Sequence, residues 1–311
     1  MTTSTTNPHD PSWRWKVILA FGAVYVIWGS TYLAIRVGVQ QLPPAMFAGA
    51  RFVIAGTLLA LYARVSGQKF AASLREWRTI AITALFMLVG ANGLVVWGEQ
   101  WVPSNQAALI VATTAQWLAG FGALGHDGHK LAPRTVLGLA VGFFGVAMLL
   151  MPEHGLLFEH SWAQLAVLAA CPAWAAGSMV AKRARLHTPP LMVAALQSLV
   201  AGIVFSGIGL ATGETVHWSW SPQAMAALAY LIVFGSCIAY AAYVWLLHEV
   251  SPSLLGTYAY INPLVAVGLG WLVLQETLNA TQLSGMVVIL IGVILVSITR
   301  PKAVTVPNQR A

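Results

Sequence analysis

The chain has 311 residues, of which 58% are hydrophobic and only 8% are charged, whereas about a quarter of the residues in an average soluble domain are charged. This composition excludes a water-soluble globular protein, because too few polar side chains are available to cover its surface. The formal net charge of +7 does not indicate a nucleic-acid partner, because the basic residues lie between apolar runs rather than in one basic module. Cys171 and Cys237 both lie inside apolar runs, which argues against disulfides and thiolate metal sites.

Ten apolar runs follow one another along the chain, each of about 20 residues, the length that a helix needs to cross the hydrocarbon core of a membrane. Helices suit these runs because they satisfy their own backbone hydrogen bonds in lipid. We predict an all-α integral membrane protein with transmembrane helices over Val17–Ile35, Pro43–Tyr62, Thr79–Gly98, Ser104–Leu124, Pro133–Met151, Trp162–Val180, Pro190–Ala211, Ala224–Leu247, Pro252–Leu274 and Thr281–Thr299.

The distribution of Lys and Arg predicts the orientation in the membrane, because cytoplasmic loops are rich in basic residues. With the N-terminus in the cytoplasm, all but two of the 16 Lys and Arg residues lie in cytoplasmic segments. The exceptions are Arg36, at the outer end of the first predicted helix, and Arg51, inside the second. The even number of spans then places both termini in the cytoplasm.

The two halves of the chain resemble each other. Trp28 and Trp174 are 146 positions apart, and further pairs recur at nearly the same spacing, among them Pro43-Pro44 with Pro189-Pro190 and Gly145-Val146 with Gly292-Val293. A unit of five helices enters the membrane from opposite faces in its two copies, which gives the inverted repeat typical of secondary transporters, with the solute site between the repeats. We predict a cytoplasmic tail over 1–16, a first repeat over 17–152, a second repeat over 161–299 and a cytoplasmic tail over 300–311.

An ordered set of short motifs accompanies this duplication: Trp28-Gly29-Ser30-Thr31, Arg51-Phe52, Ser251-Pro252, Tyr258, Tyr260, Asn262-Pro263 and Glu276. With them the chain resembles the EamA family of the drug/metabolite transporter superfamily, and within it the YedA-like members, over Val17 to Thr299. The resemblance implies a ten-helix carrier of the bacterial inner membrane that exports amino acids, related metabolites or toxic compounds. It also implies a central cavity lined by the first, third, fourth, sixth, eighth and ninth helices. The chain departs from the family at Ala115 of the fourth helix, where the ninth helix has Pro263.

Polar and aromatic residues inside the predicted helices are candidates for the cavity lining, because amphipathic rings and amides bind partly apolar solutes. The alternative for each is helix packing or an interfacial belt of aromatic side chains. The candidates are Trp28, Ser30, Tyr32, Asn92, Thr113, Gln116, Trp117, Trp174, Ser178, Tyr240, Tyr243, Tyr258 and Asn262.

Three charged residues are candidates for an anchor or a gate: Arg51, Glu99 and Glu276. An unpaired charge in the helix of Arg51 costs at least about 2.5–3.5 kcal/mol, so other groups must compensate it. Arg51 either anchors a substrate carboxylate or forms a gate, or it is a structural residue that donates to carbonyls of neighbouring helices. Glu276 either caps the tenth helix, which it precedes, or forms an external gate. Glu99 closes the third helix and is either a solvated loop acid or part of that gate. No carboxylate lies in the middle of a predicted span, so we expect no proton coupling through a buried acid.

Other patterns give little support for a cofactor or for catalysis. His126-Asp127-Gly128-His129 offers an incomplete metal site, no Gly-Lys-Ser/Thr phosphate loop supports ATP-driven pumping, and no paired catalytic groups lie at membrane depth. We expect no cofactor, no metal and no nucleic-acid partner, but a small-molecule solute and the lipid bilayer. Gly138 and Gly142 have the spacing of a close helix contact, which fits packing within a monomer as well as a homodimer.

These observations predict a secondary transporter of the inner membrane that exports small metabolites, namely amino acids, related compounds or drugs, by alternating access through the cavity between the repeats. The direction rests on the family resemblance alone. The alternative is an exchanger or importer of small metabolites, or of phosphorylated or nucleotide-linked sugars. Binding of such phosphate groups would require several cationic side chains in the cavity. A membrane sensor without catalysis is a more distant alternative, because it would need an output domain.

Overall fold

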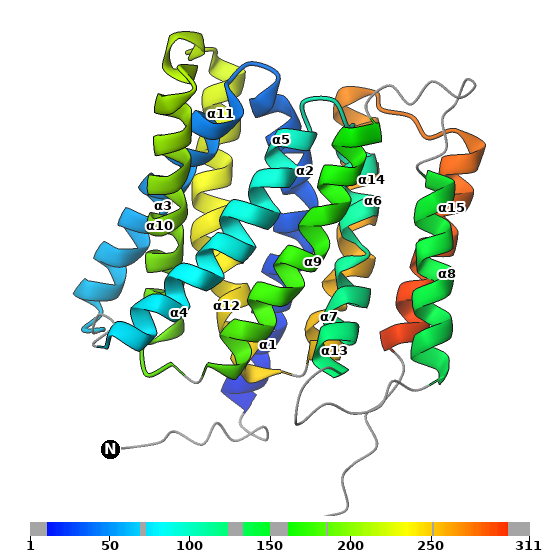
Figure 1. The fold of residues 1–311 in the computed structure, drawn as a ribbon, viewed down its shortest axis with the longest axis horizontal. Helices are drawn as coiled ribbons and strands as arrows, with labels where there is room; N and C mark the ends of the chain where they lie inside the picture. The colour runs from blue at the N-terminus through cyan, green and yellow to red at the C-terminus, as the bar shows by residue number, and fades with distance from the viewer. Residues whose placement is uncertain are drawn as a thin grey trace, which may run out of the picture.

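The computed structural model of the protein describes residues 11–68, 73–123, 133–149, 161–184, 186–250 and 252–297. Within these residues, helices are joined by turns and short connections, and there is no strand (Figure 1). Six helical runs are long and apolar enough to cross a membrane: Pro11–Val39, Pro44–Val65, Leu74–Gly98, Ser161–Arg183, Pro190–Ala211 and Pro222–Glu249. Shorter apolar helical segments lie at Val136–Met148, Ile261–Leu274 and Ala280–Gly292. The prediction of an all-α, multi-pass membrane protein is confirmed. Residues 1–10 of the predicted N-terminal tail, the whole predicted C-terminal tail over 300–311 and the His126–His129 motif lie outside the described residues.

Among the described residues of the first half of the chain there are five helical runs. They are α1 (Pro11–Gly22), η1 (Ala23–Ile27) and α2 (Trp28–Val39); α3 (Pro44–Val65); α4 (Leu74–Ala84), η2 (Leu85–Asn92) and α5 (Gly93–Gly98); α6 (Ser104–Val111) and α7 (Thr114–Ala123); and α8 (Pro133–Leu149). The segments η1 and η2 are π-helical stretches that continue the α-helices on both sides. Such stretches widen the helix locally and are frequent at functional sites.

The second half begins with α9 (Ser161–Arg183) and repeats this order. It continues with α10 (Pro190–Ala211), a short 3-10 turn η3 (Glu214–His217), the run of α11 (Pro222–Tyr230), π-helical η4 (Leu231–Tyr240) and α12 (Ala241–Glu249), the pair α13 (Pro252–Leu255) and α14 (Tyr258–Leu274), and α15 (Ala280–Ser297). Several of these helices start with proline. Proline is tolerated there because the backbone N–H groups of the first turn have no hydrogen-bond partner within the helix.

Two predicted continuous helices are wrong, because each is interrupted. The predicted helix Ser104–Leu124 breaks between α6 and α7 without any proline, and the Thr113 hydroxyl at the break donates to the Ile110 carbonyl at 2.8 Å. The predicted helix Pro252–Leu274 breaks between α13 and α14, although its inner proline, Pro263, lies within α14. Discontinuous helices of this kind often form the binding sites of transporters.

Two pairs of equivalent helices hold the halves together, one on each side of the molecule (Figure 1). On one side α3 packs antiparallel against α10, and on the other α8 packs against α15. In the second pair, a Cβ atom on Gly292 would lie 2.5 Å from the backbone nitrogen of Gly142 and 2.7 Å from the Gly138 carbonyl oxygen. The spacing of Gly138 and Gly142 therefore serves a close helix contact within the chain.

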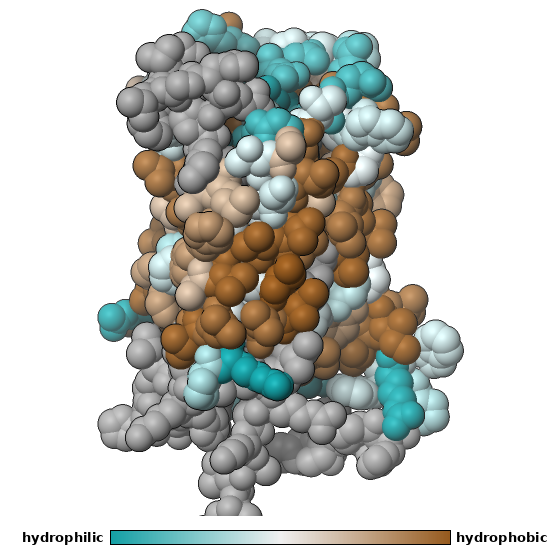
Figure 2. All heavy atoms as spheres, turned by 90° about the vertical axis from the view of Figure 1, so that its right-hand side faces the viewer, coloured by the Kyte–Doolittle hydropathy of each residue, from teal (hydrophilic) through white to brown (hydrophobic). Residues whose placement is uncertain are grey.

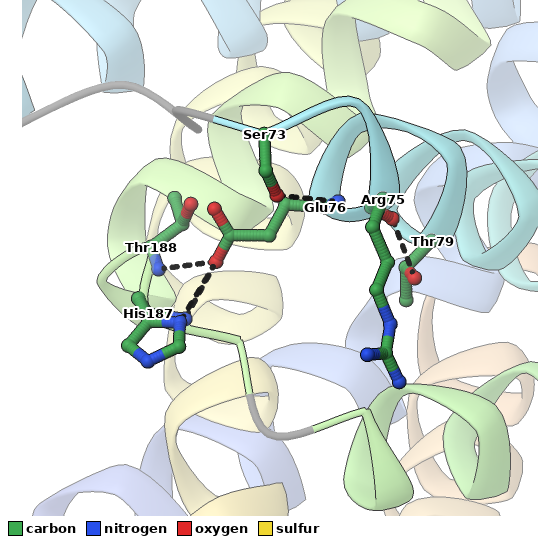
Figure 3. Close-up of polar contacts among 6 residues, drawn as sticks. All are labelled: Ser73, Arg75, Glu76, Thr79, His187 and Thr188. Carbon is green, nitrogen blue, oxygen red and sulfur yellow. Dashed lines mark hydrogen bonds and ion pairs between the residues drawn. The ribbon is translucent and has the colours of Figure 1, made fainter.

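At both ends of the α3–α10 pair, a carboxylate from one half of the chain accepts hydrogen bonds from backbone N–H groups of the other half. The Glu76 carboxylate of α4 accepts hydrogen bonds from the backbone N–H groups of His187 at 2.6 Å and Thr188 at 3.2 Å, just before α10 (Figure 3). At the other end, the Glu214 carboxylate accepts from the Met46 N–H in the first turn of α3 at 2.8 Å. Each half thus supplies a negative charge to the start of a helix in the other half, where the helix dipole favours it.

The outer face of α8 and α15 is apolar over its middle and hydrophilic towards its ends (Figure 2). Exposed side chains on these two helices include Val136, Phe144, Leu283, Val287 and Ile291. An apolar band of this kind fits contact with lipid tails.

Candidate functional site

A cavity lies between the two halves, bounded by α2, α3, η2, α5, α6, α7, α9, η4 and α14. Its volume of about 80 Å³ gives space for only a few water molecules. The third, fourth, sixth, eighth and ninth predicted helices contribute to it together with the first, as the family resemblance implies, and α3 of the second helix adds Arg51 and Phe52.

Several candidates from the sequence lie around this cavity: Trp28, Tyr32, Asn92, Trp174, Tyr240, Tyr258 and Arg51. Two polar lining residues were not predicted, Thr31 and Thr114. The sequence predicts their neighbours Ser30 and Thr113 instead, because it does not show which face of an apolar helix points inward.

The remaining candidates contact other parts of the helices. The Ser30 hydroxyl bonds with the Ile27 carbonyl and the Tyr230 hydroxyl, each at 2.6 Å. The Gln116 amide donates to the Gly138 carbonyl at 3.4 Å, and the Trp117 ring packs on Phe121 and Phe143. The Asn262 amide nitrogen lies 2.9 Å from the Tyr25 carbonyl oxygen, which joins α14 to η1. These contacts fit the alternative of helix packing.

Equivalent tryptophans of the two halves meet beside the cavity. The rings of Trp28 and Trp174 are 5.4 Å apart at an interplanar angle of 83°, and both pack on Tyr243. The Trp174 indole N–H donates to the Tyr243 hydroxyl at 2.9 Å, and the Ser178 hydroxyl lies at the same distance. Edge-to-face aromatic contacts of this kind fix ring orientation, so Tyr243 and Ser178 support the lining tryptophans from behind.

A second set of polar contacts supports Tyr240, whose ring centre lies 6.2 Å from that of Trp174. Its hydroxyl donates to the Gln197 side chain at 2.7 Å, and the Gln197 amide donates in turn to Thr83 at 2.7 Å. Gln197 occupies the position equivalent to Arg51 in the second half, 146 residues later. The two equivalent positions therefore differ, because one orients a lining tyrosine and the other carries a charge at the cavity.

Arg51 is the charged residue of the cavity lining. It is only 4% exposed, its Nε donates to the Ser236 hydroxyl at 2.9 Å, and its guanidinium carbon lies 4.8 Å from the Phe52 ring centre. Its Nη1 has no hydrogen-bond partner, and no carboxylate among the described residues lies within ion-pair distance. The side chain oxygens of Asn92 and Thr114, which also line the cavity, are likewise unpartnered. The cavity thus offers a cationic donor and polar acceptors inside an aromatic wall.

Glu99 is fully buried, and the interpretation as a solvated loop acid is wrong. It follows the apolar run Leu74–Gly98 directly, and neither carboxylate oxygen has a hydrogen-bond partner. The Arg36 guanidinium instead donates to the Glu99 backbone carbonyl. Burial raises the pKa of the Glu99 carboxyl well above its usual range, although the charge of Arg36 acts in the opposite direction.

Glu276 acts as a helix cap, but not on the helix expected from the sequence. Its carboxylate accepts from the Ser104 N–H at 3.0 Å, the Ser104 hydroxyl at 2.7 Å and the Asn105 N–H at 3.1 Å, at the start of α6. The start of α15 is capped by its own residues, because the Asn279 side chain accepts from the Gln282 N–H at 2.7 Å. Glu276 therefore joins the second half to the first.

The chain matches the EamA-like transporter family twice, over residues 14–151 and 161–298. It belongs to this family. Its relatives include YedA, an uncharacterized inner membrane transporter of Escherichia coli strain K12, which is 38% identical over 280 residues, or 90% of each chain. The uncharacterized transporter YoaV of Bacillus subtilis strain 168 is 24% identical over 91% of this chain and 97% of its own. A crystal structure with 19% sequence identity shares the fold of this chain with a TM-score of 0.68, over 90% of this chain and 95% of that one.

Family membership identifies the molecule as a membrane transporter and confirms the family resemblance found in the sequence. In an EamA-like transporter, a cavity between two matched halves is the place to look for the solute. The groups that line it therefore decide which solute chemistry fits.

Proposed function

We propose that the protein is a ten-span secondary transporter of the bacterial inner membrane that exports amino acids or related small metabolites by alternating access. Six long apolar runs support this count, and α6–α7, α8, α13–α14 and α15 are the segments proposed for the other four crossings. The concentration of Lys and Arg in alternate loops supports cytoplasmic termini. The repeats over 17–152 and 161–299 are supported by the matched tryptophans and by the two family matches.

The observation that carries the substrate class is the unpartnered Nη1 of Arg51 at the cavity. A buried guanidinium with free donors favours a carboxylate, which accepts charge-assisted hydrogen bonds. The unpartnered Asn92 and Thr114 oxygens offer acceptors for an ammonium group, and the tryptophan and tyrosine rings offer an apolar wall. An amino acid, above all one with an apolar or aromatic side chain, combines these three features.

The fold supports alternating access through relative motion of the two halves. They meet along α3–α10 and α8–α15, and the cavity lies between these two contacts. A cavity of about 80 Å³ is smaller than typical ligand sites of about 300–1,000 Å³. The halves must therefore move apart before a solute enters.

Exchange or import of phosphorylated or nucleotide-linked sugars is less well supported. Doubly charged phosphate groups favour several cations, and among the described lining residues Arg51 is the one basic side chain. A single guanidinium suits a single carboxylate better.

The test compares metabolites in the medium of bacteria that overproduce the wild type, Arg51→Ala or Arg78→Ala. Arg78 is an exposed cation of α4 far from the cavity lining, so its variant controls for loss of charge alone. Immunoblots of membrane fractions verify equal amounts of protein. We expect amino acids to accumulate outside with the wild type and Arg78→Ala but not with Arg51→Ala. Equal accumulation with Arg51→Ala would show that Arg51 does not anchor the solute. No accumulation with any of the three proteins would favour exchange or import.

A further inference from the structure

The upper end of the bundle in Figure 1 is where α5 ends and α6 begins. Glu99 lies between these two helices in the sequence, and its carboxylate has no hydrogen-bond partner. Glu99 is fully buried there, and both of its carboxylate oxygens lack hydrogen bonds. An ionised carboxylate is strongly unfavourable in such surroundings, so burial favours the protonated form. Glu99 directly follows the run Leu74–Gly98 and does not lie in the middle of a span, so the expectation of no proton coupling through a buried acid did not take it into account.

The titratable and charged groups that act electrostatically on Glu99 come from three parts of the chain. Arg36 and Tyr32 belong to α2, Arg51 belongs to α3, and Glu276 follows α14. The charges of Arg36 and Arg51 favour an ionised Glu99, whereas burial and the charge of Glu276 oppose it. Because these influences oppose each other, access of water at this end would remove the burial penalty and leave two cations to stabilise the carboxylate.

The acid also lies where the two halves are joined. Glu276 of the second half caps α6 in the first through Ser104 and Asn105, the residues that follow the α5–α6 turn. One turn before Glu99, Val95 of α5 lines the solute cavity. A movement that opens the cavity towards this end must therefore shift the surroundings of Glu99.

We propose that Glu99 is a proton-binding site of the transporter, which holds one proton while this end of the bundle is closed and releases it to water when the end opens. The role in opening rests on the proposed transport function. The step is a simple acid dissociation, in which the carboxyl O–H bond breaks, the electron pair stays on the carboxylate and the proton passes to water. The proton is thus a ligand of the closed state, and high pH favours the open one.

Infrared spectroscopy tests the protonation itself, without any solute. The full-length protein in lipid vesicles is titrated between about pH 5 and about pH 9, and the absorption of protonated carboxyl groups is followed. We expect an absorption in the wild type that persists at neutral pH, is lost in Glu99→Gln and is retained in Glu249→Gln. Glu249 is a half-exposed acid at the far end of α12, where its carboxylate accepts from Trp13. Absence of the absorption at neutral pH in the wild type, or its survival in Glu99→Gln, would overturn the proposal.

Thiol labelling tests the link to opening. Val102, which is 1% exposed in the turn before α6, is replaced by Cys in a chain with Cys171→Ala and Cys237→Ala, and reacts with a water-soluble maleimide. Labelling of Val216→Cys, at a position that is 81% exposed, in the same cysteine-free chain corrects for the rise of the thiolate fraction with pH. We expect labelling to rise by about tenfold across the titration of Glu99, and to stay flat with Glu99→Gln. A rise of the same size in Glu99→Gln would refute the link.

These measurements separate the two proposals. If no export is observed but the infrared and labelling experiments give the expected results, the transport proposal is refuted and the proton-binding site stands. Export without the infrared absorption would retain transport and remove Glu99 as a proton-binding site.

Discussion

Replacement of Arg51 by Met separates the structural cost of the buried guanidinium from its use in transport. The side chain is 4% exposed and has one hydrogen-bond partner, Ser236, at 2.9 Å. Methionine has a similar length and no charge, and it adapts to irregular gaps. The variant therefore removes the charge and its bonds while it fills much of the same space.

The magnitude follows from three contributions. Removal of the charge relieves a cost of about 2.5–3.5 kcal/mol for an arginine within a membrane helix. Loss of the Ser236 hydrogen bond costs about 1.5 kcal/mol, and loss of the contact with the Phe52 ring, 4.8 Å away, costs about 0.5–1 kcal/mol. Arg51→Met should therefore be more stable than the wild type by about 1 kcal/mol and should not export amino acids.

The assay is reversible unfolding in detergent micelles, followed by circular dichroism, together with the export measurement. Ser236→Ala is the matched control, because it keeps the cation and removes its one hydrogen-bond partner. It should lower the free energy of unfolding by about 1–3 kcal/mol. If Arg51 were a structural residue whose charge is well compensated, Arg51→Met would instead lower the free energy of unfolding by about 3–5 kcal/mol. That loss, or normal export by the variant, would refute the reasoning.

Three further predictions concern the contacts between helices and the buried acid. Glu276→Ala removes the cap of α6 and should lower the free energy of unfolding by about 1–2 kcal/mol, measured in the same detergent assay. The stability of the wild type should fall as pH rises from the unfolded-state pKa of Glu99 through its higher folded-state pKa, by about 1.4 kcal/mol for each unit between the two, and pH titration of Glu99→Gln should lack this fall. Gly292→Leu should clash with α8 and cost about 1–3 kcal/mol, whereas Gly268→Leu, which meets open space, should be tolerated in thermal unfolding.

The fold was largely predictable because its main signal is local. Apolar runs of membrane-spanning length, prolines at helix starts and the recurrence of matched residues are all visible in the sequence. The interruptions at Ala112–Thr113 and Gly256–Thr257 were not. Both lie inside continuous apolar runs, so hydropathy does not mark them, and the first contains neither proline nor glycine.

The site was less predictable, because a helix that is apolar all round carries no periodic pattern to show its inward face. Trp28 and Trp174 could be identified from the repeat, and their rings do meet. Residue type alone predicts Tyr243 and Ser178 as cavity residues, yet they form the layer behind those rings. Residue type thus located the polar network, but packing decided which members reach the cavity.

The two acids at the upper end show why sequence position could not assign their roles. Both follow apolar runs and look alike in the sequence, but α6 presents its free N–H groups to a single carboxylate. Glu276, 172 positions after Ser104 along the chain, accepts hydrogen bonds from the Ser104 hydroxyl and from the first backbone N–H groups of α6. The Glu99 carboxylate accepts no hydrogen bond, although Glu99 is only a few residues from α6. Because the same donors cannot satisfy both acids, the contact that joins the two halves also leaves Glu99 buried without a partner. A movement that breaks this contact would free donors beside Glu99 at the moment when water arrives, and both changes favour loss of its proton.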